Sequence, residues 1–218
     1  MNSKEGAIGT SSYGETRMWR NGHKQQIKNQ MMEEALEMWT ELEKETGQEL
    51  IVHKDILIIG SQQNPDFGTI LDQYKDTVLL TPNEIMDKYS ALKNIPSSYS
   101  GIELSIGGVV KARLALESTR KLLESKYNSD LKFNTKVFKV TKNSVETEKG
   151  ETYYAKHVVI ATGPYTPETF DKGTANKKME VEYFTFTDNS NLPGGIIELN
   201  EKGQRFYGLL DHQNQSSC

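Results

Sequence analysis

Two arginines near the start of the chain are the side chains best suited to binding an anion. Arg17 and Arg20 lie three residues apart, shortly after Ser11, Ser12 and Tyr13. If this segment forms a helical turn, residues at that spacing share one face. A guanidinium group is planar, keeps its charge at any working pH and matches carboxylate or phosphate. The pair therefore predicts an anion-binding site, and a solvated turn with two surface arginines is the alternative.

The second candidate is the most apolar run of the chain, residues 157–161 (His-Val-Val-Ile-Ala), which is followed by Thr162, Gly163 and Pro164. A run this apolar is typical of a strand that is buried on both faces, as in a parallel sheet. A turn with glycine at the carboxyl end of such a strand lets the backbone approach a nucleotide. We therefore expect a ligand near Ala161, and an ordinary exit from a strand is the alternative.

Other kinds of site are excluded by composition. The 218 residues carry a formal net charge of −4, which gives no basic face for nucleic acid. The single cysteine, Cys218, excludes an intrachain disulfide and a multi-cysteine metal site. The four histidines show no ligand spacing, and the sequence contains none of the motifs G-x-G-x-x-G, G-x-x-x-x-G-K-[ST], H-E-x-x-H and G-x-S-x-G. We predict no metal site and no nucleic-acid partner.

The chain also lacks the apolar stretch of about 20 residues that a membrane span requires, and Met1 is not followed by the apolar core of a secretory signal. We therefore expect an intracellular, cytoplasmic α/β protein that does not bind membranes.

The elements that must position these residues follow from periodicity and turn residues. Residues 1–23 have no helical or strand period and are predicted to be loop. A helix is expected after them, with its apolar face formed by Ile27, Met31, Ala35, Trp39 and Leu42 and its end at Gly47. Further helices are predicted at 67–74, from a capped start at Thr81 to residue 89, and at 109–126 with residues 112, 115, 116, 119, 122 and 123 facing inward. Strands are predicted at 49–53, 55–60, 101–106, 131–133, 136–141, 144–147, 152–154, 157–161, 179–187, 195–199 and 204–210, the last three antiparallel.

Taken together, these segments resemble the FAD-dependent amine oxidases typified by monomeric sarcosine oxidase and N-methyltryptophan oxidase. That family has a G-[DE]-[ST]-R-x-x-R segment followed by a helix with an L-W-x-E-L-E-like pattern, and residues 14–20 (Gly-Glu-Thr-Arg-Met-Trp-Arg) and the helix ending at 41–47 are similar to it. The similarity continues, in order and with matching spacing, at residues 53–60, 107–110, 135–137, 158–165 and 205–208.

The resemblance implies an α/β (α+β) fold in which a partial FAD-binding domain is interleaved with a mostly antiparallel substrate-binding sheet. Residues 1–46 and 104–170 would form the FAD-binding part, and residues 47–103 and 171–218 the substrate-binding part. The activity implied is oxidation of a secondary amine or an N-methyl amino acid by FAD, with reoxidation by O₂ to give H₂O₂.

The resemblance also implies roles for individual residues. Arg17 would lie beside the flavin ring as the catalytic residue, Arg20 would pair with the substrate carboxylate, and Tyr207 would line the substrate pocket. The residues that would contact FAD are Ser11, Ser12, Tyr13, Arg17, Met18, Val137, Ala161, Thr162 and Gly163.

The departures from the family pattern concern the cofactor. The G-x-G-x-x-G turn of the family is missing, Tyr13 stands in place of a family histidine near the flavin, and Cys218 does not match the cysteine that attaches flavin. We therefore expect a truncated family member that does not retain FAD and is inactive alone. The alternatives are a non-catalytic binding module and a subunit whose flavin site is completed by self-association or by a separate Rossmann-type chain.

Overall fold

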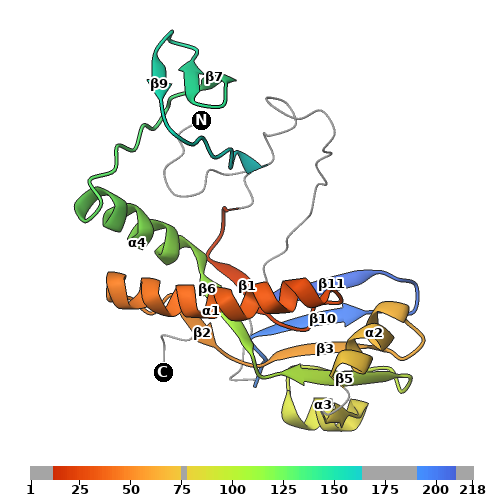
Figure 1. Cartoon of the computed structure of the whole chain (residues 1–218). Helices are drawn as coiled ribbons and strands as arrows, with labels where there is room; N and C mark the ends of the chain where they lie inside the picture. Colours follow the sequence, from red (N-terminus) through yellow and green to blue (C-terminus); the bar gives the residue numbers. More distant parts are fainter. Residues whose placement is uncertain (1–11, 75–77, 164–190, 210–218) are drawn as a thin grey trace. The chain divides into compact units, whose positions relative to one another are not determined.

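The computed structural model describes residues 12–74, 78–163 and 191–209, which belong to two compact units (Figure 1). The larger unit contains residues 15–122 and 191–209, and the smaller one contains residues 12–14 and 123–163. Each unit is described by itself. The predicted division into FAD-binding and substrate-binding parts is a division by function and stays a prediction.

The larger unit is built on a five-stranded sheet with the strand order β11-β10-β3-β5-β4. Its strands are β11 (Arg205–Leu209), β10 (Gly195–Leu199), β3 (Ile56–Ser61), β5 (Tyr99–Leu104) and β4 (Leu79–Leu80). Only β10 and β3 run parallel, and the other three pairs are antiparallel. The structure thus confirms a mostly antiparallel sheet with strands at 195–199 and 205–209, whereas the predicted strand 179–187 lies outside the described residues.

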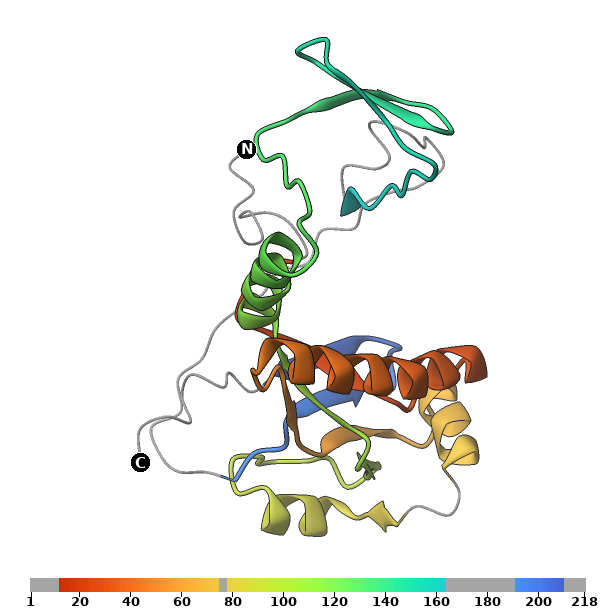
Figure 2. The same cartoon turned by 60° about the vertical axis from the view of Figure 1, so that its left-hand side comes forward.

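The central strand β3 is buried on both faces because a helix covers each side of the sheet (Figures 1 and 2). Ile56 and Ile58 pack with Phe67 of α2 (Pro65–Gln73). Leu57 and Ile59 point to the opposite face and pack with residues of α3 (Pro82–Lys88), as the two-residue period of a strand requires. The predicted capping box at the start of α3 is confirmed, since the Thr81 and Glu84 side chains each bond the other residue's backbone.

A second sheet in the larger unit has the order β1-β6-β2, with all pairs antiparallel. It consists of β1 (Thr16–Arg20), β6 (Gly107–Lys111) and β2 (Ile51–His53). Two helices, α1 (Gln26–Thr46) and α4 (Ala112–Ser125), contribute to the core on this sheet. Two residues separate β2 from β3, and two residues separate β5 from β6. Two short connections therefore link the three-stranded sheet to the five-stranded sheet.

The structure corrects two predicted segments and one predicted side-chain orientation in this unit. Residues 16–20 form β1 instead of loop, and β6 occupies 107–111, where the helix was expected to begin at 109. In both segments the backbone N–H and C=O groups form hydrogen bonds with a strand that is distant in sequence. The periodicity of neighbouring residues does not reveal such pairing. Leu116, predicted to face inward from α4, is exposed.

The buried face of α1 also differs from the predicted one. Ile27 and Met31 are exposed, and the residues that face the sheet are Asn29, Met32, Leu36, Trp39 and Leu42. The face is rotated because Asn29, a polar residue, is buried in the first turn. The helix ends where expected, at Gly47, which has a φ of 66°.

The smaller unit contains a three-stranded antiparallel sheet of β7 (Val137–Val140), β8 (Ser144–Thr147) and β9 (Thr152–Tyr154). These strands and the turn at Gly150, with a φ of 83°, agree with the sequence. Two predicted strands are absent: neither 131–133 nor 157–161 is a strand, and the Val159 side chain is 87% exposed. A strand needs a hydrogen-bonded neighbour, and no described residue pairs with residues 157–161.

Within the described part of the chain, none of the helices combines the length and the apolar composition that crossing a bilayer would take.

Candidate substrate-anion site

Arg17 and Arg20 lie on opposite faces of a strand, not on one face of a turn. Both belong to β1, in which side chains alternate between the two sides of the sheet. Met18 packs on the core of the five-stranded sheet, whereas Trp19 packs in the core beside α1. Arg20 therefore shares the side of Met18, and Arg17 shares that of Trp19. The prediction that both arginines share one face is wrong.

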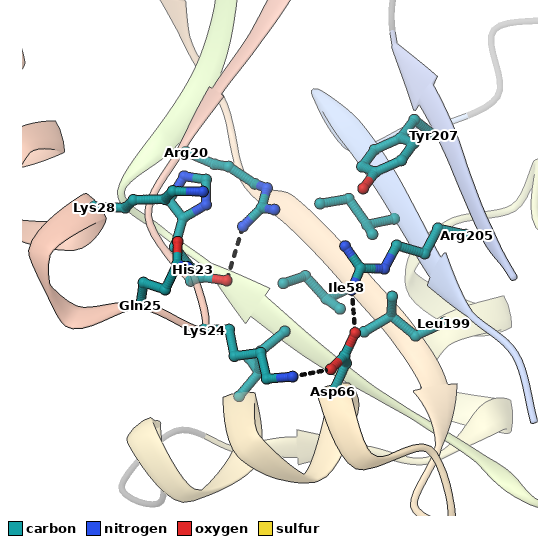
Figure 3. A pocket seen from close by; sticks show the side chains of 13 residues that line it. Arg20, His23, Lys24, Gln25, Lys28, Ile58, Asp66, Leu199, Arg205 and Tyr207 are labelled. Carbon is teal, nitrogen blue, oxygen red and sulfur yellow. Dashed lines mark hydrogen bonds and ion pairs between the residues drawn. The ribbon is translucent and has the colours of Figure 1, made fainter. Parts of the chain in front are cut away.

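Arg20 lies at a cavity of about 210 Å³ in the larger unit (Figure 3). The cavity is lined by aliphatic side chains from β3, α2 and β10 and by polar side chains from the segment 20–28, from α2 and from β11. Its lining residues are Arg20, Gly22, His23, Lys24, Gln25, Lys28, Ile58, Asp66, Ile70, Ile197, Leu199, Arg205 and Tyr207. The cavity thus combines an apolar floor with a charged wall.

The Arg20 guanidinium has hydrogen-bonding capacity left for a ligand. Its Nη1 donates to the backbone oxygens of Asn21 at 2.9 Å and Gly22 at 2.8 Å. Nε and Nη2 have no hydrogen-bond partner among the described residues, and no carboxylate in this part of the chain forms an ion pair with Arg20. Burial lowers the pKa of Arg20, and Tyr207 and Tyr74 oppose this change. Because an arginine stays protonated in proteins, the cavity holds a half-buried charge that a carboxylate would compensate.

The loop after β1 is fixed by polar side chains of both neighbouring helices. The Gly22 N–H donates to the Tyr74 hydroxyl at 2.8 Å. The buried Asn29 of α1 accepts from the His23 N–H at 2.8 Å and donates to the His23 oxygen at 3.0 Å. Gln73 donates to the Lys24 oxygen at 2.8 Å. These bonds fix the loop that carries the Asn21 and Gly22 carbonyl oxygens, to which Arg20 donates.

Asp66 is the carboxylate of the cavity wall. It accepts from the Lys24 ammonium and the Arg205 guanidinium (Figure 3), and these two bonds lower the pKa of Asp66. It stands in the first turn of α2, where the helix dipole also favours a negative charge. Burial, Arg20 and Lys28 lower the pKa of His23, so His23 is neutral at pH 7.

Tyr207 comes to the same cavity from β11, and its hydroxyl faces the space that Arg20 faces (Figure 3). The structure therefore brings together Arg20 and Tyr207, the two residues that were expected to contact substrate. Sequence reasoning missed His23, Lys24, Lys28, Asp66 and Arg205. Of these five residues, only Arg205 could have been predicted from the sequence, because it precedes Tyr207 in segment 205–208, which resembles the family.

The residues expected to contact FAD are divided between the two units. Arg17 and Met18 belong to the larger unit, whereas the other described ones belong to the smaller unit. Ser12, Tyr13 and residues 161–163 are exposed, Val137 is half-buried on β7, and Ser11 lies outside the described residues. A Cβ built on Gly163 would meet no atom within 4 Å. The arrangement of these residues around FAD therefore stays a prediction.

Comparison with known proteins places the chain in a family. A sequence model described as "DAO: FAD dependent oxidoreductase" matches residues 3–197. Peroxisomal sarcosine oxidase of Homo sapiens is 26% identical over 162 residues, which are 72% of this chain and 41% of that protein. Probable sarcosine oxidase of Arabidopsis thaliana is 21% identical over 166 residues, or 71% of this chain and 40% of that protein. The chain thus spans about two fifths of the length of the curated relatives it matches.

Solved structures share the α/β fold. NikD, an unusual amino acid oxidase essential for nikkomycin biosynthesis, superposes in its Tyr258Phe mutant form with a TM-score of 0.72 at 20% identity, covering 99% of this chain and 58% of that one. L-proline dehydrogenase from P. horikoshii gives a TM-score of 0.61 at 18% identity, covering 77% of this chain and 47% of that one. With a family match over residues 3–197, the chain belongs to the FAD dependent oxidoreductase family.

Proposed function

We propose that this chain carries the substrate-carboxylate site of a FAD-dependent amine oxidase acting on a small secondary amine or N-methyl amino acid, with H₂O₂ as the reduced product of O₂. The observation that supports this most is Arg20, whose Nε and Nη2 have no partner among the described residues and lie at the wall of a small cavity. A planar guanidinium with two adjacent donors binds a carboxylate through two parallel hydrogen bonds.

The rest of the cavity suits a small amino acid. Ile58, Ile197 and Leu199 offer an apolar surface for its alkyl groups, and the Tyr207 hydroxyl can accept or donate a hydrogen bond. The surplus of positive charge disfavours the protonated form of a bound amine, and therefore favours the neutral amine. In the relatives the oxidising chemistry belongs to the flavin, and the share of these residues is to bind and orient the amine.

A polypeptide of these 218 residues is expected not to retain FAD and not to oxidise amines. The sequence has no G-x-G-x-x-G turn to receive the diphosphate. The measurement is to add excess FAD to the purified chain, desalt it, and record flavin absorbance and peroxide formation with sarcosine. Bovine serum albumin carried through the same column serves as the control for non-specific carry-over.

Stoichiometric flavin with amine-dependent peroxide would contradict this expectation and show that the chain, or an assembly of it, forms the whole site. Flavin retained only after addition of a Rossmann-type partner chain would support the alternative of a two-chain oxidase.

A further inference from the structure

The cavity beside Arg20 contains more positive charge than one substrate carboxylate would neutralise. Four cationic side chains line it, those of Arg20, Lys24, Lys28 and Arg205, against the single carboxylate of Asp66. His23 adds no charge at pH 7, because burial and the neighbouring cations lower its pKa. A ligand with one carboxylate would therefore leave an excess of positive charge on the wall.

This charge is separated into two regions by the strands that carry it. Arg20 ends β1, whereas Arg205 begins β11 on the other side of the cavity (Figure 3). Ile58 and Leu199 line the same cavity as these two arginines. An acid with two charged ends joined by methylene groups matches a cavity that offers two cations and an apolar lining.

The second region is only partly neutralised within the protein. Asp66 divides its charge between Lys24 and Arg205, so that the three groups together remain positive. The side chains of Asp66 and Tyr207 raise the pKa of Arg205. Its side chain is 50% exposed and that of Lys24 is 55% exposed, which leaves both accessible from the cavity.

Resting on the proposed function, we propose that the substrate is a dicarboxylic amine: an N-substituted amino acid whose side chain ends in a second carboxylate. The α-carboxylate binds Arg20, and the second carboxylate binds at Arg205 and Lys24. The methylene groups between them contact Ile58 and Leu199. A cavity of about 210 Å³ has room for a compound of this size.

The test compares ligands that differ only in the second charge. Glutarate and its monomethyl ester have chains of equal length, but the ester has lost one carboxylate. Binding of each to the full chain can be measured by two-dimensional NMR titration at low ionic strength, because weak affinities are then accessible and screening is small. We expect glutarate to bind about threefold to fivefold more tightly than the ester, the range for a half-exposed ion pair.

Variants of Arg205 assign that difference to one side chain. In Arg205→Gln the preference for glutarate should disappear, and in Arg205→Lys it should persist in part because the charge remains. Arg113→Gln is the matched control, since Arg113 is also a partly exposed arginine paired with a carboxylate, Glu15, outside this cavity. Arg113→Gln should keep the full preference for glutarate over its monomethyl ester.

The outcomes separate this proposal from the function on which it rests. If both ligands bind with equal affinity and both shift the Arg20 signals, the dicarboxylate proposal is overturned while the carboxylate site stands. If neither ligand perturbs Arg20, the proposed function fails as well. A preference that survives Arg205→Gln would also overturn the assignment.

Discussion

Gly108→Ala is expected to lower the free energy of unfolding by about 3 kcal/mol, the upper part of the range for overpacking a well-packed site. A Cβ at this position would lie 2.1 Å from the Val52 carbonyl oxygen and 3.2 Å from the His53 Cα. Both atoms belong to the backbone of β2, which pairs with β6 at this point. The added methyl group must push the two strands apart.

The control for this variant is Gly68→Ala, in the interior of α2. A Cβ at Gly68 would meet no atom within 4 Å, so the substitution should keep stability or raise it by up to about 1 kcal/mol through helix propensity. Urea unfolding followed by circular dichroism measures both variants. Equal stabilities for Gly108→Ala and the unmodified chain would show that β2 and β6 are not packed as described.

Arg20→Met is expected to weaken binding of sarcosine to the chain by about tenfold to a hundredfold, because a charge-assisted pair of hydrogen bonds is lost. Met keeps much of the aliphatic length, so that the cavity wall is retained while the charge is removed. Arg20→Lys should give an intermediate loss, since lysine supplies charge without the planar fork. NMR titration of each variant gives the affinities.

Two comparisons make the Arg20 result specific. Arg113→Met removes another partly exposed arginine, one that bonds Glu15 outside the cavity, and should leave the affinity unchanged. Sarcosinamide, which has no carboxylate, should bind the unmodified chain and Arg20→Met equally weakly. An Arg20→Met variant that is folded and binds sarcosine with unchanged affinity would refute the carboxylate role of Arg20.

The sequence predicted best those elements whose signals are local. The capping box of α3 and the glycine at the end of α1 depend on neighbouring residues alone, and both are as expected. Four of the five strands of the five-stranded sheet, β3, β5, β10 and β11, were also predicted, because apolar and β-branched residues lie there between clear turn signals. The short strand β4 (Leu79–Leu80) was not predicted.

Prediction failed where an element depends on distant partners. The apolar runs 56–61 and 157–161 look alike in sequence, yet β3 is fully buried between α2 and α3 while Ile160 of the second run is 45% exposed. The difference is that β3 pairs with β5 and β10, whereas no described residue pairs with the second run. Composition gives the tendency to form a strand, but pairing decides whether it forms.

The candidate site was predicted only in part for a similar reason. Resemblance to a family indicated Arg20 and Tyr207, which lie at one cavity. The sequence did not indicate that Asn29 and Asp66 belong to the site. Asn29 bonds His23, and Asp66 pairs with Lys24 and Arg205, and these contacts exist only in the folded chain. Hydrophobic periodicity treats a buried asparagine as exposed, which is why the predicted face of α1 was rotated.

The most direct test of the carboxylate site is to observe the arginine side chains during ligand binding. Uniform ¹⁵N labelling of the chain, with Arg20→Lys used to assign the Arg20 Nε–H signal, allows sarcosine and sarcosinamide to be titrated in parallel. We predict that sarcosine shifts the Arg20 Nε–H signal in a saturable manner and that sarcosinamide does not. An unchanged Arg20 signal at saturating sarcosine, or an equal shift with the amide, would contradict the proposal that this cavity binds the substrate carboxylate.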